Sequence, residues 1–222
     1  MTEYKSWPLG QLPPEFQRPE LDQLKKNGYK FSDPREVVDI FEKKVAKFAG
    51  AKYGIAVDCC SHGLFLSLKW YKDVMKMITE HIHIPRYTYC SVPMQIIHAG
   101  FKPVFEDVTW SGMYQLKPFD IWDGAVRWTQ GMYKSGFHIV SFQLKKRIPI
   151  GRGGMILTND IKAADWLRKM TYDGRDLTIS YMDDDFEHCG YHYYMTPEDA
   201  ARGILLMDQV PKKNLDSGNN RT

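Results

Sequence analysis

Short apolar runs alternate with longer stretches of helical periodicity along most of the chain, and this alternation restricts the fold more than any other feature of the sequence. The helical stretches repeat apolar side chains at intervals of three and four residues, as expected for helices with one buried face. We expect strands at residues 54–57, 81–84, 102–106, 119–122, 138–142 and 155–158. We expect helices at residues 34–49, 62–77, 91–98, 161–172 and 197–207. This order is typical of an α/β fold in which helices flank a mainly parallel sheet.

The best-defined helix start lies at Asp33. Pro34 follows at a position where a helix tolerates proline, and Glu36 can bond back to the backbone at the cap. Gly50 follows the last apolar position of the pattern. The sequence therefore predicts a helix from about Pro34 to Ala49.

The chain has the size of one domain. Its 222 residues, with 43% hydrophobic content, can bury one substantial core. We expect that domain at residues 31–211. Residues 1–30 hold several prolines and few apolar side chains, so we expect an extended N-terminal arm. Residues 212–222 are expected to be a polar tail, polar enough for disorder.

Charge and cysteine content exclude several classes of protein. The net charge is only +3 and the basic residues are scattered, so the basic face of a nucleic-acid-binding protein is missing. The sequence has no N-terminal signal segment and no apolar stretch long enough to span a bilayer. Its cysteines lack the spacing of a zinc site and are expected to be small buried apolar residues. These features favour a cytoplasmic protein that binds neither nucleic acid nor membranes. The cysteines are Cys59, Cys60, Cys90 and Cys189.

Polar side chains follow the expected strands at their carboxyl ends, where ligands bind in sheets of this class. Ser61 follows the first strand at a helix N-terminus, where free N–H groups and the helix dipole favour an anion such as phosphate. Tyr89, Asp123 and Lys146 follow three later strands. An anion anchor, an aromatic ring, a carboxylate and an amine are the groups needed to hold pyridoxal 5'-phosphate.

The lysine lies in a turn rich in glycine. Gly151, Gly153 and Gly154 permit a tight reversal and a close approach of the backbone to a ligand. Lys145 competes with Lys146 for the role, because a shift of one residue in register would exchange them. A basic turn whose lysines face only water is the simpler interpretation of this stretch alone.

Three segments carry a resemblance to a known family. They are Phe48-Ala49-Gly50-Ala51-Lys52-Tyr53, preceded by Phe41-Glu42-Lys43-Lys44; Ile84-Pro85-Arg86-Tyr87-Thr88-Tyr89; and the run from Ala99 to Val108, Ala-Gly-Phe-Lys-Pro-Val-Phe-Glu-Asp-Val. From about Phe41 to Gln209 the chain resembles the DegT/DnrJ/EryC1/StrS sugar aminotransferases, which are fold-type-I pyridoxal-phosphate enzymes. The resemblance implies the large domain of such an enzyme, with the smaller C-terminal domain missing.

The resemblance assigns individual roles. The family places its cofactor-binding lysine five residues after the serine of a Ser-Phe-His run, and that register selects Lys146 after Ser141. Asp123 matches the aspartate that pairs with the pyridine nitrogen, and Tyr89 matches the aromatic residue stacked on the ring. Ser61 and Ser141 match hydroxyls that bind the phosphate. Two further positions are implied: Cys60 in the phosphate loop, and His192 where the family has an asparagine that reaches the phosphate of the neighbouring subunit.

The chain also departs from the family pattern. Val126 stands where the family has a glutamine or histidine that bonds the cofactor's ring hydroxyl. Cys60 replaces a glycine, Tyr194 replaces an arginine, and Arg152 stands where the family usually has glutamate. Gln143 replaces the histidine of the Ser-Phe-His run.

Several of these residues have a purely structural alternative. Tyr89 could pack at the rim of the sheet, and Ser61 could cap the following helix. His192 could pack among the neighbouring tyrosines. An acidic run near the C-terminal end could form a metal site, but a solvated loop is the favoured interpretation. The run contains Asp183, Asp184, Asp185, Glu187 and His188.

As the resemblance implies, we expect a homodimeric transaminase that moves an amino group from an amino acid to a nucleotide-linked keto-sugar. Lys146 and Asp123 are its expected catalytic residues. A shortened, catalytically impaired homologue that acts as a binding or regulatory subunit is the alternative, supported by the missing C-terminal residues and by Val126. A dehydratase that uses the same cofactor without the lysine is disfavoured because Lys146 is present.

Overall fold

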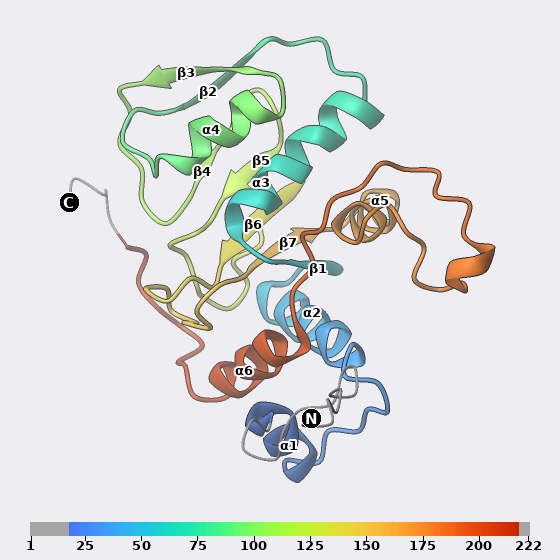
Figure 1. The fold of residues 1–222 in the computed structure, drawn as a ribbon. Coiled ribbons are helices and arrows are strands. Elements are labelled where there is room, and N and C mark those ends of the chain that lie inside the picture. The colour runs from blue at the N-terminus through green and yellow to red at the C-terminus, as the bar shows by residue number, and fades with distance from the viewer. Residues whose placement is uncertain (1–17, 218–222) are drawn as a thin grey trace, which may run out of the picture.

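The computed structural model describes residues 18–217 and shows helices on both sides of a central sheet (Figure 1). The α-helices are α1 (Pro19–Lys26), α2 (Glu36–Ala49), α3 (Cys60–Lys69), α4 (Ser91–His98), α5 (Ile161–Thr171) and α6 (Pro197–Met207). The strands are β1 (Tyr53–Val57), β2 (His81–Pro85), β3 (Lys102–Glu106), β4 (Tyr114–Gln115), β5 (Ile121–Asp123), β6 (Phe137–Ser141) and β7 (Gly154–Thr158). A π-helical turn, Trp70–Val74, extends α3, and a 3₁₀ turn, Tyr181–Asp183, lies in the loop after α5.

Five strands form the main sheet in the order β1-β7-β6-β5-β4, and β2 pairs with β3 in parallel beside it. β5 and β6 are parallel, whereas β7 is antiparallel to both of its neighbours. Residues 142–153 join β6 to β7 without a helix between them, a connection that suits an antiparallel pair better than a parallel crossover. The short strand β4 is also antiparallel to its neighbour β5. The α/β class with flanking helices is confirmed, and β1, β5 and β6 share one direction as expected. Three of the five strand pairings in the described residues are antiparallel, so the strand arrangement is mixed and not mainly parallel.

Two apolar clusters lie on opposite faces of this sheet. One joins α3, α4 and α5 to the sheet, and its largest fully buried side chains include Phe119, Leu64 and Ile82. The other joins α1, α2 and α6 to the opposite face around Phe41 and Phe142, whose ring centroids lie 5.2 Å apart. These clusters fix the carboxyl ends of β1, β5 and β6 at one edge of the sheet.

The hydrogen bonds expected around Asp33 are present, but α2 begins two residues later than predicted, at Glu36, and its N-cap residue Arg35 forms no side-chain cap. The Glu36 carboxylate accepts a hydrogen bond from the backbone N–H of Asp33 at 2.8 Å, and Asp33 accepts one from the N–H of Arg35 at 2.9 Å. At the other end Gly50 has φ +83°, a left-handed conformation that glycine adopts without strain.

The expectation of an extended arm at residues 1–30 is wrong for its described part. Residues 19–26 form α1, which packs on α6 with Leu21 and Leu24 buried. The two leucines are spaced three residues apart, so one turn of helix places both on the core side. The rest of the arm, up to residue 17, lies outside the described residues.

Two further expectations need correction. Cys90 and Cys189 are exposed instead of buried, and Cys59 and Cys60 are only partly covered; all four are free thiols. The described part of the polar tail, residues 212–217, runs along the domain: Arg127 lies 3.5 Å from Asp216. No helix within residues 18–217 is long and apolar enough to cross a membrane.

Candidate functional site

Asp123 lies at the carboxyl end of β5 and is only 6% exposed. Its Oδ2 accepts a hydrogen bond from the Tyr114 hydroxyl at 2.7 Å, and its Oδ1 accepts one from the N–H of Ala125 at 2.9 Å. Burial raises the pKa of Asp123, while both hydrogen bonds and the positive charge of Lys146 act in the opposite direction. The result is a fixed, desolvated carboxyl group at the edge of the sheet.

Lys146 comes from the turn between β6 and β7, and its charge reaches the Asp123 carboxyl. Its charge lowers the pKa of both Asp123 and the Cys60 thiol, although burial keeps the Cys60 pKa well above its usual range. Lys145 is exposed, and its backbone N–H bonds to the side chain of Gln143. Lys146 is half-buried and its charge acts on Asp123 and Cys60, whereas Lys145 is exposed, so Lys146 is the better placed of the two lysines.

The N-terminus of α3 adjoins this group. The N-cap residue is Cys59, and its side chain accepts no hydrogen bond from the first turn. Ser61 lies inside that turn, so the interpretation of Ser61 as the helix cap is wrong. Its hydroxyl lies 2.7 Å from the hydroxyl of Ser91, the first residue of α4. Two hydroxyls and a helix N-terminus without a side-chain cap thus lie together, which is the chemistry of an anion site.

Gly154 explains how the turn between β6 and β7, which carries Lys146, packs against α3. A Cβ at Gly154 would lie 2.6 Å from the backbone nitrogen of Cys60 and 2.8 Å from the carbonyl carbon of Cys59. The missing side chain lets the start of β7 pack directly against the N-terminus of α3. Ser141, at the end of β6 opposite Gly154, is buried beside the same turn.

Tyr89 lies on the loop after β2 and is 72% exposed. The alternative of a tyrosine packed at the rim is therefore wrong, and the ring is free to meet a ligand. The preceding residue, Thr88, is hydrogen-bonded through its hydroxyl to Tyr114, which in turn contacts Asp123. The loop that carries Tyr89 is thus tied to the buried carboxyl.

His192 stands apart from these residues. Its side chain is 67% exposed, its Nδ1 lies 2.9 Å from Asp173 Oδ2, and its ring meets that of Tyr194 at 4.6 Å edge-on. The packed-histidine alternative accounts for the ring contact but not for the exposure. A contact with a second subunit stays a prediction.

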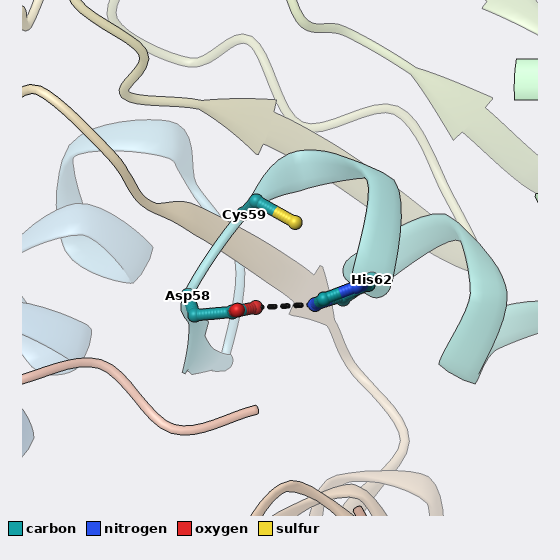
Figure 2. Close-up of side chains that lie close together, drawn as sticks. All are labelled: Asp58, Cys59 and His62. Atoms are coloured by element: carbon teal, nitrogen blue, oxygen red, sulfur yellow. Dashed lines mark hydrogen bonds and ion pairs between the residues drawn. The ribbon is translucent and has the colours of Figure 1, made fainter. Parts of the chain in front are cut away.

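Sequence reasoning missed a group of charged side chains next to the site. Figure 2 shows Asp58, Cys59 and His62 around the start of α3. Asp58 Oδ1 lies 2.6 Å from His62 Nδ1. Arg152, from the lysine turn, lies 2.6 Å from the other oxygen of Asp58. Burial favours neutral His62, but its bonds to Asp58 and Cys59 prevail and raise its pKa to about 9. The i,i+4 spacing of Asp58 and His62 was the one signal in the sequence for this group.

Asp58, Cys59 and His62 place a carboxylate, a thiol and an imidazole within 4.8 Å of one another. In the described part of the chain, the acidic run after α5 does not bring three potential metal ligands as close together. The guanidinium of Arg152 already occupies Asp58, which disfavours a cation there.

The residues present fit pyridoxal 5'-phosphate. The uncapped α3 N-terminus with Ser61 suits its phosphate, the buried carboxyl of Asp123 suits its ring nitrogen, and the nearby Lys146 suits its aldehyde. Val126, where the family has a polar side chain, offers no hydrogen bond to a ring hydroxyl.

Comparison with known proteins agrees with this geometry. Residues 15–122 and 130–217 match the sequence model of the DegT/DnrJ/EryC1/StrS aminotransferase family. Asp123 and Val126 lie in the short stretch between the two matched segments.

Among named relatives, the chain is 26% identical over 202 residues to the spore coat polysaccharide biosynthesis protein SpsC of Bacillus subtilis, with 70% of this chain and 50% of that protein covered. It is 24% identical over 217 residues to the uncharacterized protein MJ1066 of Methanocaldococcus jannaschii, with 74% and 55% covered. The chain therefore spans about half the length of the relatives it matches.

Solved structures show the same fold. AtS13 from Actinomadura melliaura superposes with a TM-score of 0.71 at 17% identity, covering 86% of this chain and 64% of that one. The sugar aminotransferase CalS13 from Micromonospora echinospora gives 0.69 at 16% identity, with 86% and 64% covered.

Proposed function

The chain belongs to the DegT/DnrJ/EryC1/StrS aminotransferase family, and from this premise we propose that it acts as a pyridoxal-phosphate-dependent transaminase. The substrates would be an amino acid as donor and a nucleotide-linked keto-sugar as acceptor. The observation that carries the proposal is that the charge of Lys146 acts on the buried Asp123 and on Cys60, the first residue of α3, whose N-terminus has no side-chain cap.

The bound cofactor supplies an electron sink that stabilises negative charge on the carbon next to the reacting nitrogen. Asp123, when ionised, would hold a proton on the ring nitrogen, and Tyr114 keeps its carboxylate in place. Lys146 would hold the cofactor covalently and then, once released, carry the proton to and from the substrate carbon at Nζ. Ser61, Ser141 and the first turn of α3 would bind the phosphate.

We also propose that the active form is a cytoplasmic homodimer. The exposure of the His192 side chain supports this, because a partner subunit could cover it and receive His192 near its own phosphate site. Four free cysteines accord with a reducing compartment.

Borohydride reduction in the presence of pyridoxal phosphate tests the proposal directly. We expect a stable label on Lys146, found by peptide mass spectrometry, and loss of the label in Lys146→Arg but not in Lys145→Arg. Labelling of Lys145 instead, or none in the wild type, would remove Lys146 from its role.

Turnover separates the transaminase from the impaired subunit that Val126 suggests. Conversion of the bound cofactor to its amine form by an amino acid indicates a working transaminase. Labelling of Lys146 without this conversion indicates a protein that binds the cofactor only.

A further inference from the structure

We propose that Asp58 is a positioning residue that fixes the lysine-bearing turn to the N-terminus of α3, with Arg152 and His62 as its two partners. This inference rests on the proposed function, because its consequence is the alignment of Lys146 with the anion site. The carboxylate makes one contact to each partner, both at 2.6 Å.

Arg152 is the link to the lysine turn. It lies between the turn that carries Lys146 and the start of β7, and its side chain reaches Asp58 on the loop between β1 and α3. The Asp58 side chain is 19% exposed, whereas the Arg152 side chain is 68% exposed, so solvent screens this ion pair from the arginine side only. Gly154 already brings the two backbones into contact, and the ion pair fixes their relative position.

His62 is the link to the helix. It lies in the first turn of α3, one residue after Ser61, and its ring stacks on Tyr193 with 3.7 Å between ring centroids. The N–H of Asp58 also donates to the carbonyl of Tyr193 at 2.8 Å. The segment of Tyr193 therefore contacts both members of the Asp58–His62 pair, which fixes the direction of the carboxylate.

The three segments joined here carry three different parts of the candidate site. The turn carries Lys146, the helix carries Ser61, and the segment of Tyr193 carries His192. Because Asp58 is the shared partner, its removal would loosen the turn and the helix together, although Asp58 itself need not touch the cofactor.

A double-mutant cycle tests the proposal with Asp58→Asn, Arg152→Gln and both changes combined. Pyridoxal phosphate affinity is measured by quenching of tryptophan fluorescence in the apoprotein, and the rate of borohydride-trapped labelling of Lys146 is measured beside it. We expect each single change to weaken affinity or labelling about tenfold, which corresponds to about 1.4 kcal/mol, and the double variant to be no worse than the singles. Additive losses, or no loss, would overturn the link.

Two readouts need no cofactor. Hydrogen exchange of residues 143–153 should speed up in Asp58→Asn and in Arg152→Gln, and the NMR pKa of His62 should fall in Asp58→Asn. The charged or titratable groups around His62 are Asp58, Cys59 and Tyr193, with Arg152 beyond Asp58. Unchanged hydrogen exchange in both variants would refute the positioning role of Asp58, even if the cofactor binds. A wild-type protein that does not bind pyridoxal phosphate would refute the proposed function but not the positioning role of Asp58.

Asp208→Asn is the matched control. Asp208 forms an ion pair of the same 2.6 Å length with Lys44, away from the candidate site. We expect it to leave affinity, labelling and exchange of the turn unchanged. Asp58→Glu keeps the charge and should recover part of the affinity for pyridoxal phosphate. If Asp58→Glu binds the cofactor as weakly as Asp58→Asn, the charge of Asp58 is not what positions the turn.

Discussion

Tyr114 and Asp123 lie directly opposite each other on the antiparallel strands β4 and β5, and the Tyr114 hydroxyl donates to Asp123 Oδ2 at 2.7 Å. The same hydroxyl is bonded to Thr88, so a hydrogen-bonded chain runs from the loop of Tyr89 to the buried carboxyl. Removal of this one hydroxyl would therefore disturb both the carboxyl and the loop.

Tyr114→Phe should raise the pKa of Asp123 further, because the bond from Tyr114 is the largest influence that lowers it. A buried carboxylate oxygen without its donor costs on the order of 1–3 kcal/mol. We expect lower apoprotein stability in urea at neutral pH and slower turnover. Tyr133→Phe is the control, since its hydroxyl bonds to the Gly136 carbonyl instead. Equal turnover in Tyr114→Phe and wild type would contradict the role of this bond.

Asp123→Asn tests the carboxyl itself. The amide is nearly the same size but carries no charge, so it should keep the labelling of Lys146 while turnover falls about 10²–10³-fold. Single-turnover conversion with an amino-acid donor is the measurement. Loss of both labelling and turnover would mean that Asp123 maintains the structure of the site and does not act by stabilising the charge on the cofactor's pyridine ring.

Local patterns were enough to predict most elements. The helix Ser91–His98, the strand Lys102–Glu106 and the helix Pro197–Met207 have the predicted bounds, because periodicity and caps within each segment determine them. The choice of Lys146 came from its register after Ser141, and it stays a prediction. Roles in binding and catalysis remain predictions.

The features of the fold and the site that were not predicted depend on contacts between segments distant in sequence. β4 has two residues, too short for any pattern, yet it supplies Tyr114 to Asp123. Arg152 meets Asp58 across 94 positions of sequence, and no local signal connects them. α1 was missed because its prolines outweighed the two leucines that tertiary packing buries.

Gly154→Ala should weaken cofactor binding more than the addition of a single methyl group suggests. The new Cβ would clash with backbone atoms of Cys59 and Cys60, which cannot move without shifting the N-terminus of α3. We expect the affinity for pyridoxal phosphate to fall at least about tenfold.

Gly54→Ala is the matched control for this change. Its Cβ would also meet backbone, the Glu42 carbonyl oxygen at 2.9 Å, but away from the candidate site. It should cost stability and leave affinity unchanged. Similar affinity losses in both variants would mean that Gly154 acts through general stability.

His192→Ala tests the shared site. If His192 reaches the phosphate site of a partner subunit, wild-type affinity for the cofactor should fall as the protein is diluted through dimer dissociation, because part of the site leaves with the partner. The variant should bind several-fold more weakly at high concentration and lose this dependence. His81→Ala, at another exposed histidine, should behave as wild type. Sedimentation that shows a monomer with concentration-independent affinity would refute the role.

Glu42→Gln should change how the stability of the apoprotein depends on pH. Glu42 is buried on α2, where its Oε1 accepts from the N–H of Ala56 at 2.7 Å and its Oε2 lies 3.6 Å from Arg168. Burial raises its pKa to about 7, against an ordinary value of 4.5. Between these values the folded state keeps a proton that the unfolded state has lost, so stability falls as pH rises from about 4.5 to about 7.

The contribution is on the order of 3 kcal/mol at full ionisation. Glutamine can still accept the Ala56 hydrogen bond but does not titrate, so the variant should lose less stability than wild type between pH 5 and pH 8 in urea unfolding. Glu187→Gln, at an exposed carboxylate in the loop after α5, should keep the wild-type slope. Parallel stability curves for Glu42→Gln and wild type would show that Glu42 is ionised in the folded state throughout, with Arg168 close enough to outweigh its burial.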